Sequence, residues 1–181
     1  MSSAPSIVKS IMTVIGGSLL AYSATATPRN LHVEPSLVNS GVLLCGGTHF
    51  FRTNSNQQVR TSYSLRNFSP TTTQIINSVK VFDAQGGIRC DYPLVDPFPA
   101  TFDPVLLPHW STGFETTKMD ECHNPITNNL PEEFRPLQVV ISWSGQPARM
   151  PVVGRYSTKL VDADTRQVMS DRPAKCDNAP D

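Results

Sequence analysis

The stretch Gln58–Gly87, which reads QVRTSYSLRNFSPTTTQIINSVKVFDAQGG, decides the fold of this chain. In its first part apolar or aromatic residues alternate with polar ones, which predicts a strand with one buried face and one solvated face. The expected buried face consists of Val59, Thr61, Tyr63 and Leu65. Asn67–Pro70 ends this strand, because proline cannot donate to a ladder and Asn and Ser favour turns. A second strand is expected from Thr73 to Phe82, so the stretch predicts a pair of strands joined by a turn.

The same alternation recurs at Ile88–Tyr92, Leu137–Trp143 and Val152–Val161. Between them, five prolines at positions 93 to 108 exclude a central strand and favour an extended crossing. About seven to nine short strands at this spacing predict an all-β, antiparallel, immunoglobulin-like β-sandwich. Residues 27–181 are expected to form it as a single domain with a loose C-terminal tail. The positions expected to build the core are Leu65, Val79, Val81, Val139, Ile141 and Trp143.

The N-terminal residues have the pattern of a secretory signal peptide. Lys9 precedes a short apolar run, Ile11–Leu20, and small residues follow at Ala24 and Ala26. The apolar run is well short of the roughly 20 residues that a membrane-spanning helix needs. We therefore expect residues 1–26 to be a signal peptide cleaved after Ala26, with an uncleaved anchor as the alternative. The mature protein is then expected in the periplasm or outside the cell.

The charge balance excludes some classes of partner. The chain has 15 Lys and Arg against 15 Asp and Glu. Loss of Lys9 with the signal peptide leaves 14 against 15, a net charge near −1. Nucleic acids and anionic membranes require a basic footprint, so neither is expected as a partner.

Four cysteines lie beyond the expected cleavage site: Cys45, Cys90, Cys122 and Cys176. An even number in an exported chain predicts two disulfides, for which three pairings are open. We favour Cys90 with Cys122, which would close the proline-rich loop. Cys45 with Cys176 would then tie the tail to an early strand.

Three segments in succession resemble a small exported bacterial all-β family of unknown function. They are Tyr63–Asn67 (YSLRN), Val79–Gly86 (VKVFDAQG) and Val139–Trp143 (VVISW). The resemblance covers about Asn56 to Val153. It implies a β-sandwich in the bacterial envelope, and it carries over no catalytic residue.

The sequence indicates no catalytic machinery. Ser142–Gly145 (SWSG) lacks the leading glycine and the following helix of a nucleophile elbow. The acid pairs Glu132–Glu133 and Asp162/Asp164 lack the spacing of a calcium loop and are expected to be solvated. We therefore expect no cofactor, and a non-enzymatic binding or structural module.

A metal site is the alternative function. Met119, Cys122 and His123 lie within five residues, and His109 lies beside the proline-rich loop. Thioether, thiolate and imidazole together would suit copper(I), which would make the chain a periplasmic copper-handling protein. A disulfide at Cys122 would remove the thiolate.

A possible partner surface lies in the proline-rich region. Its aromatic residues are Phe98, Phe102, Trp110 and Phe114. If they are exposed together, they mark a protein or carbohydrate surface. If they are buried, they close the open end of the sandwich. The sequence leaves both readings open.

Overall fold

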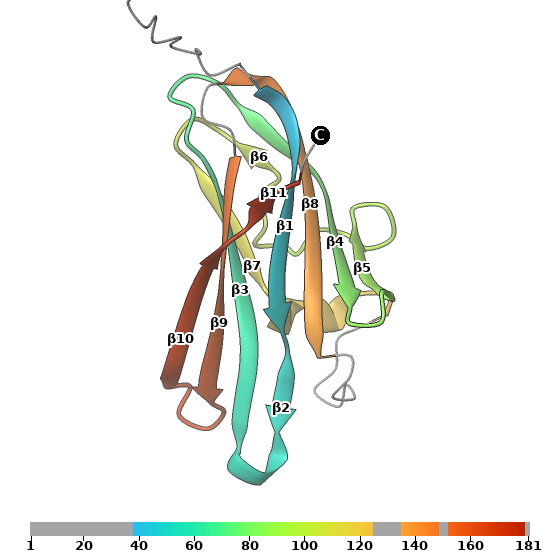
Figure 1. Ribbon diagram of the computed structural model, residues 1–181, viewed down its shortest axis with the longest axis vertical. Coiled ribbons are helices and arrows are strands. Elements are labelled where there is room, and N and C mark those ends of the chain that lie inside the picture. Colours follow the sequence, from blue (N-terminus) through green and yellow to red (C-terminus); the bar gives the residue numbers. More distant parts are fainter. Residues whose placement is uncertain (1–37, 125–134, 149–151, 180–181) are drawn as a thin grey trace, which may run out of the picture. The chain divides into compact units, whose positions relative to one another are not determined.

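The computed structural model describes residues 38–124, 135–148 and 152–179 (Figure 1). The expected signal peptide lies outside these residues. The described residues form eleven β-strands and two short 3-10 helices, and none of them lies in an α-helix. The strands make two antiparallel sheets packed face to face, so the expectation of an antiparallel β-sandwich is confirmed.

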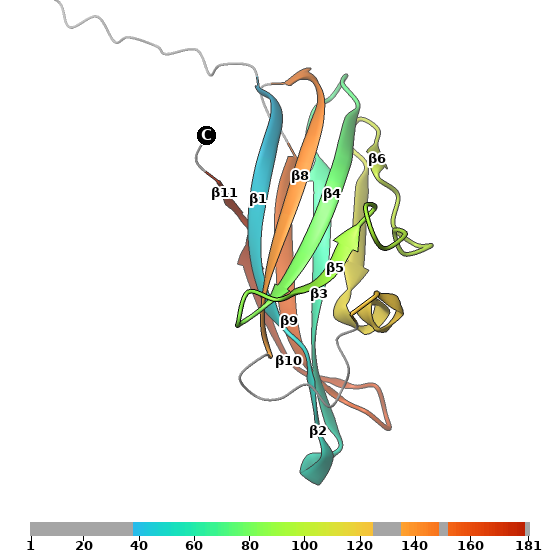
Figure 2. The ribbon, with the colours of Figure 1, turned by 90° about the vertical axis from the view of Figure 1, so that its right-hand side faces the viewer.

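Six strands form the first sheet, called sheet A. Its order is β11-β1-β8-β4-β5, and β6 pairs with β4. The bounds are β1 Val38–Thr48, β4 Gln74–Asp83, β5 Ile88–Tyr92, β6 Val105–Leu106, β8 Pro136–Ala148 and β11 Asp177–Asn178. In Figure 2 the long strands β1, β8 and β4 face the viewer.

Five strands form the second sheet, called sheet B. Its order is β10-β9-β3-β2, and β7 pairs with β3. The bounds are β2 Phe50–Arg52, β3 Gln57–Asn67, β7 Ser111–Glu115, β9 Val152–Asp162 and β10 Val168–Lys175. The deciding stretch therefore forms β3 and β4, but these strands lie in different sheets. The two strands do not pair with each other, because the turn after Asn67 carries the chain across the sandwich.

The core lies between the sheets and contains all six positions that the alternation predicts. Leu65, Val79, Val81, Val139, Ile141 and Trp143 are buried, which confirms the expected register. The expected number of strands, however, is too low. The strands β6 and β11 have only two residues each and too little alternation to be recognised, and β10 is exposed along most of its length.

The C-terminal tail is not loose as expected. Residues after Asp171 complete β10 and then form β11, which pairs with Leu43 and Leu44 of β1. Cys176 between these strands is bonded to Cys45 of β1. The sequence does not reveal β10, because its side chains are exposed on both faces and show no alternation, as suits the edge of a sheet.

At one end sheet B extends beyond sheet A. Strand β1 ends at Thr48, and the chain continues after His49 as β2 in the other sheet. Figures 1 and 2 both show the β2–β3 and β9–β10 hairpins projecting past the ends of the sheet A strands. We call this region the overhang of sheet B.

Candidate functional site

Two disulfides join the four cysteines. Cys45 bonds Cys176, and Cys90 bonds Cys122 across 32 residues that include the proline-rich loop. These two disulfides are the pairing that the sequence analysis favours among the three possible ones. Two disulfides are typical of proteins in an oxidising, extracytoplasmic compartment.

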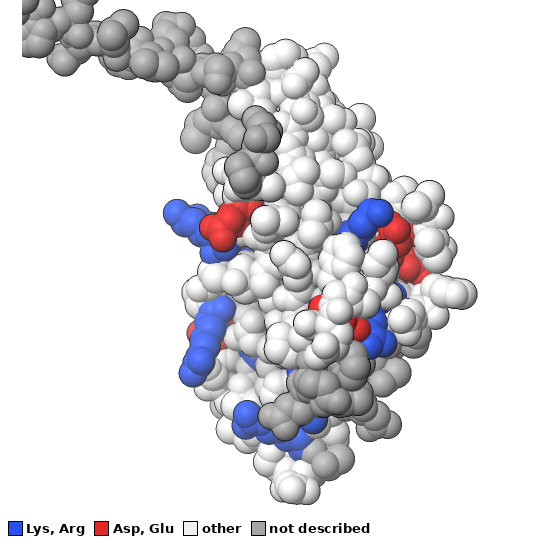
Figure 3. All heavy atoms as spheres, turned by 45° about the vertical axis from the view of Figure 1, so that its right-hand side comes forward, with Lys and Arg blue, Asp and Glu red and all other residues white. Residues whose placement is uncertain are grey.

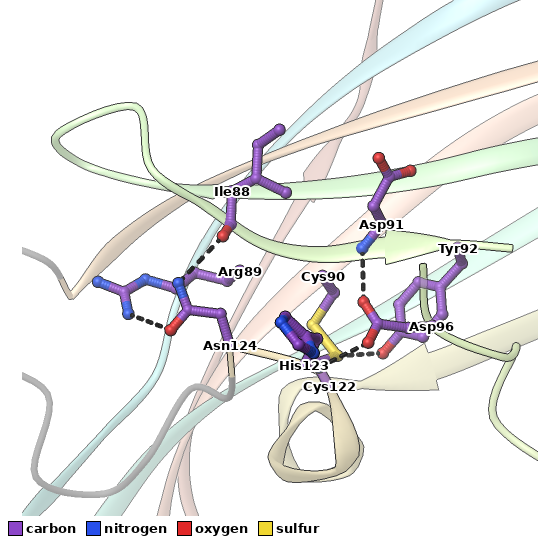
Figure 4. Close-up of a disulfide and its surroundings, with 9 residues drawn as sticks. All are labelled: Ile88, Arg89, Cys90, Asp91, Tyr92, Asp96, Cys122, His123 and Asn124. Carbon is purple, nitrogen blue, oxygen red and sulfur yellow. Dashed lines mark hydrogen bonds between the residues drawn. A yellow bond between two sulfur atoms is a disulfide. The ribbon is translucent and has the colours of Figure 1, made fainter. Parts of the chain in front are cut away.

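The Cys90–Cys122 disulfide joins the edge strand β5 of sheet A to the chain that follows the 3-10 helix Thr116–Glu121 (Figure 4). The hydroxyl of Tyr92 donates a hydrogen bond to the sulfur of Cys122, at 2.8 Å. The buried carboxylate of Asp96 accepts hydrogen bonds from the backbone N–H groups of Asp91 and His123, at 2.9 and 2.6 Å. Asp96 thus connects β5 to the chain just after Cys122, which reinforces the disulfide.

A shallow cavity of about 300 Å³ lies beside this disulfide. Ile88, Val95, Asp96 and His123 are among its lining residues. Both oxygens of Asp96 are already used by backbone donors, and Asp91 turns its carboxylate away from Asp96 toward the neighbouring strand (Figure 4). There Asp91 pairs with Lys80 at 3.2 Å. The cavity therefore presents no convergent set of reactive groups.

The candidate metal ligands do not come together as a site. Cys122 is oxidised, which removes the thiolate from the copper-binding hypothesis. Met119 lies in the 3-10 helix Thr116–Glu121 and is fully buried in the core. His123 lines the shallow cavity, whereas His109 lies in the turn before β7. Among the described residues no three His, Cys, Asp or Glu side chains are grouped so that they could hold a metal ion.

An acidic side chain, Asp83, organises the β4–β5 hairpin. Arg89 contacts its carboxylate through Nε at 2.7 Å and Nη2 at 2.6 Å. The backbone N–H groups of Gln85 and Gly87 donate to its other oxygen, at 2.9 and 2.8 Å. Burial alone would raise the pKa of Asp83, but these donors outweigh it and hold the pKa below the ordinary 3.8. The ionised carboxylate of Asp83 therefore has a structural role in the hairpin.

Three of the four loop aromatics are packed inward. Phe102 and Phe114 are buried, and Phe98 is partly buried against the core. Their rings form a continuous series from Tyr92 through Phe98, Phe102 and Phe114 to Tyr63, with centroids 4.7–5.9 Å apart. The proline-rich crossing therefore closes one side of the sandwich with these three rings.

Trp110 is the exception, because its side chain is 53% exposed. Three exposed aliphatic residues accompany it: Ile75, Val105 and Leu107. Ile75 and Val105 are partners in the β4–β6 ladder, so their side chains lie on the same face. We call these four residues the Trp110 surface. In Figure 3 the upper ends of the sheet A strands carry no charged side chains among the described residues.

The turn that carries Trp110 is held by a side chain that sequence reasoning missed. The side-chain amide of Asn67, which is fully buried, donates to the backbone oxygens of Thr72, Leu106 and Leu107, at 2.7–3.2 Å. The backbone N–H of Asn67 also donates to the oxygen of Trp110, at 3.0 Å. Asn67 was predicted only as a turn residue, and its long-range bonds have no signal in the sequence.

A second polar group lies inside the sandwich, near the overhang. His49 is buried, and its Nδ1 lies 2.9 Å from the hydroxyl of Thr116. The backbone N–H of Thr61 donates to the same hydroxyl, at 3.0 Å. These contacts place the imidazole of His49 between β2, β3 and the 3-10 helix Thr116–Glu121.

Comparison with known proteins assigns no family. No model of a protein family matches the chain, and no curated protein matches it. The crystal structure of Thermotoga maritima 1070 matches over 77% of this chain and 92% of that one, with 12% identity and a TM-score of 0.36. A match at this level assigns no function. In the part of the chain that the structure describes, no helix has the length and apolar character needed to cross a bilayer.

Proposed function

We propose that this chain is an exported, non-enzymatic binding module whose partner docks on the Trp110 surface. The observation that carries the proposal is the exposed indole of Trp110, in the turn that directly follows the exposed residues Val105 and Leu107. Exposed apolar groups of this kind mark interaction sites, and tryptophan is enriched among the residues that dominate binding energy. The partner is a protein or a carbohydrate, since either can pack against an exposed indole.

The rigidity of the turn supports this proposal. Asn67 holds the segment from Leu106 to Trp110 through three hydrogen bonds, so the indole is presented from a fixed backbone. A preorganised surface loses less conformational entropy when a partner binds. The neighbouring phenyl rings already fill the core, which leaves Trp110 without a packing role there.

The two disulfides support an exported location. If residues 1–26 are a signal peptide, the protein recovered from its native host will begin at Thr27. N-terminal sequencing of that protein measures this directly. A mature protein that begins at Met1 or Ser2 would contradict the export step but not the binding surface.

Binding at Trp110 can be tested through its fluorescence. The chain has two tryptophans, and Trp143 is buried, so iodide should quench chiefly Trp110. We expect immobilised protein to capture a partner from extracytoplasmic proteins or surface polysaccharides of the host, and the complex to lose iodide quenching. Trp110→Ala should abolish capture, whereas Leu94→Ala, at an exposed apolar residue outside the Trp110 surface, should retain it. Equal capture by both variants would refute the proposed surface.

A further inference from the structure

The overhang of sheet B contains an apolar groove on its inner face. Phe50, Val59, Leu160 and Ser170 are successive partners across β2, β3, β9 and β10. Partners in a ladder point to the same face, so the first three form an apolar floor three strands wide. The groove has a volume of about 220 Å³. Sheet A ends short of these hairpins (Figure 2).

Two arginines border this floor at opposite edges of the sheet. Arg52 follows Phe50 by two residues on β2, and Arg172 follows Ser170 by two residues on β10, so both lie on the groove side. Both are exposed lining residues of the groove. Figure 3 shows basic side chains gathered toward the lower end of the molecule.

The positive charge at the groove is not neutralised by neighbouring acids. No acid is among the residues that line the groove. Within the described ranges, the ion pairs involve neither Arg52 nor Arg172. The acid Asp162 lies in the same ladder row as Arg52, with Gln57 of β3 between them. Its Oδ1 accepts hydrogen bonds from the N–H groups of Asp164 and Thr165.

One of the two groove arginines, Arg52, is oriented by a contact with the floor. The guanidinium carbon of Arg52 lies 5.4 Å from the centroid of the Phe50 ring, and that of Arg135 lies 4.8 Å from it. Such a contact holds the guanidinium of Arg52 over the ring by charge and leaves the in-plane N–H donors of Arg52 available. Behind the floor, the hydroxyls of Thr61 and Thr158 lie 3.2 Å apart and join β3 to β9.

We propose that this groove binds a small organic anion, a carboxylate or sulfonate carried on a short aliphatic or aromatic body. The apolar floor would take the body, and Arg52 and Arg172 would bind the anionic group, since guanidinium groups form strong charge-assisted bonds to such oxygens. The groove holds the volume of about seven water molecules, which suits a phenyl ring or a short alkyl chain. The groove lies at the opposite end of β3 from the Trp110 surface, so a negative result at one site does not contradict the other.

The experiment uses the oxidised protein and two ligands of equal shape. Isothermal titration with 4-phenylbutyrate should show saturable binding, and the neutral 4-phenylbutyramide should bind about tenfold more weakly or not at all. Arg172→Gln and Arg52→Gln should each weaken binding of 4-phenylbutyrate by about tenfold, the loss expected for one charge-assisted bond. Arg155→Gln, an exposed arginine on the outer face of β9, should bind as the wild type does.

Two further measurements separate a groove from a general basic surface. Leu160→Asn should weaken 4-phenylbutyrate binding, because the variant loses an apolar residue of the floor. Inorganic phosphate alone should bind the wild type much more weakly than 4-phenylbutyrate, because phosphate has no apolar body. Amide chemical shifts of Thr158 and Ser170 should move on titration of the wild type, and thermal unfolding should show that each variant is folded. The proposal would be overturned by the absence of saturable binding or by equal affinity for the acid and the amide. Unchanged affinity in the double variant Arg52→Gln/Arg172→Gln would also overturn it.

Discussion

Trp143 shows how single residues determine the packing of this sandwich. It lies on the inner face of β8 and is 3% exposed. Its ladder partner on β1 is Gly41, where an added Cβ would lie 2.9 Å from the indole ring. The largest side chain of the core therefore lies opposite a residue with none, and the indole fills the space between the strands.

Trp143→Ala should lower the free energy of unfolding by about 3–5 kcal/mol, because the variant loses a buried indole and keeps a cavity. That is a large part of the roughly 5–15 kcal/mol that a single domain has. Urea unfolding followed by circular dichroism measures the loss.

Arg66→Ala is the matched control, since Arg66 is exposed on the solvated face of β3, where its guanidinium lies over the ring of Phe68. It should change the free energy of unfolding by about 0.5 kcal/mol. Small, equal losses in both variants would show that the indole does not pack as described.

At the scale of elements, the β4–β5 hairpin depends on the charge of Asp83. A carboxylate with a lowered pKa contributes stability that is fully present above its unfolded pKa, near 3.8, and is lost as the pH falls through its folded pKa. The pKa of Asp162 is also lowered, by hydrogen bonds from Thr165 and Asp164, so the stability of the wild type at low pH reflects both groups.

Asp83→Asn isolates the hairpin. At pH 7 it should lower the free energy of unfolding by about 1.5–3 kcal/mol, through the weaker bonds to Arg89 and to the turn. The difference between wild type and variant should be constant above about pH 5 and shrink below about pH 4. Urea unfolding at a series of pH values tests this. A difference that stays constant to pH 2 would show that the ionised carboxylate has no role. Asp177→Asn, on the exposed β11, is the control and should change the free energy of unfolding by about 0.5 kcal/mol or less at pH 7.

At the scale of the whole molecule, the two disulfides connect segments that the sheets alone hold weakly. Cys45–Cys176 spans 131 residues and ties the exposed β10 and β11 to the core strand β1. Cys90–Cys122 spans 32 residues and closes the proline-rich crossing. Both act mainly by restricting the unfolded chain, and the longer loop restricts it more.

The paired substitutions Cys45→Ala/Cys176→Ala and Cys90→Ala/Cys122→Ala should therefore differ. Loop closure accounts for about 5 kcal/mol in the first case and about 4 kcal/mol in the second. The first pair should lower the midpoint of thermal unfolding more, as measured by calorimetry. Thiol titration of the denatured, unreduced wild type should find no free thiol. Four free thiols would contradict both the predicted difference between the two cysteine variants and the extracytoplasmic location.

Much of the fold could be predicted from local pattern. Leu65, Val81, Ile141 and Trp143 are buried as their alternation predicts, because a strand turns successive side chains to opposite faces whatever lies beyond it. Alternation does not identify the edge strands: β10 is exposed on both faces, and β11 is too short to alternate. The assignment of β3 and β4 to different sheets was equally hidden, since alternation does not identify the partner of a strand.

By itself, the sequence determined an all-β chain, its core positions and the number of its cysteines, because these follow from side-chain periodicity and composition. Only the tertiary structure decided which aromatics are exposed. Phe102 and Trp110 lie in the same proline-rich region, yet one fills the core and the other faces solvent. The groove between Arg52 and Arg172 likewise exists only in the fold, because 119 residues separate arginines that the pairing of β2, β3, β9 and β10 brings to one face. Contacts between distant segments arise from the pairing of strands, and no local pattern encodes them.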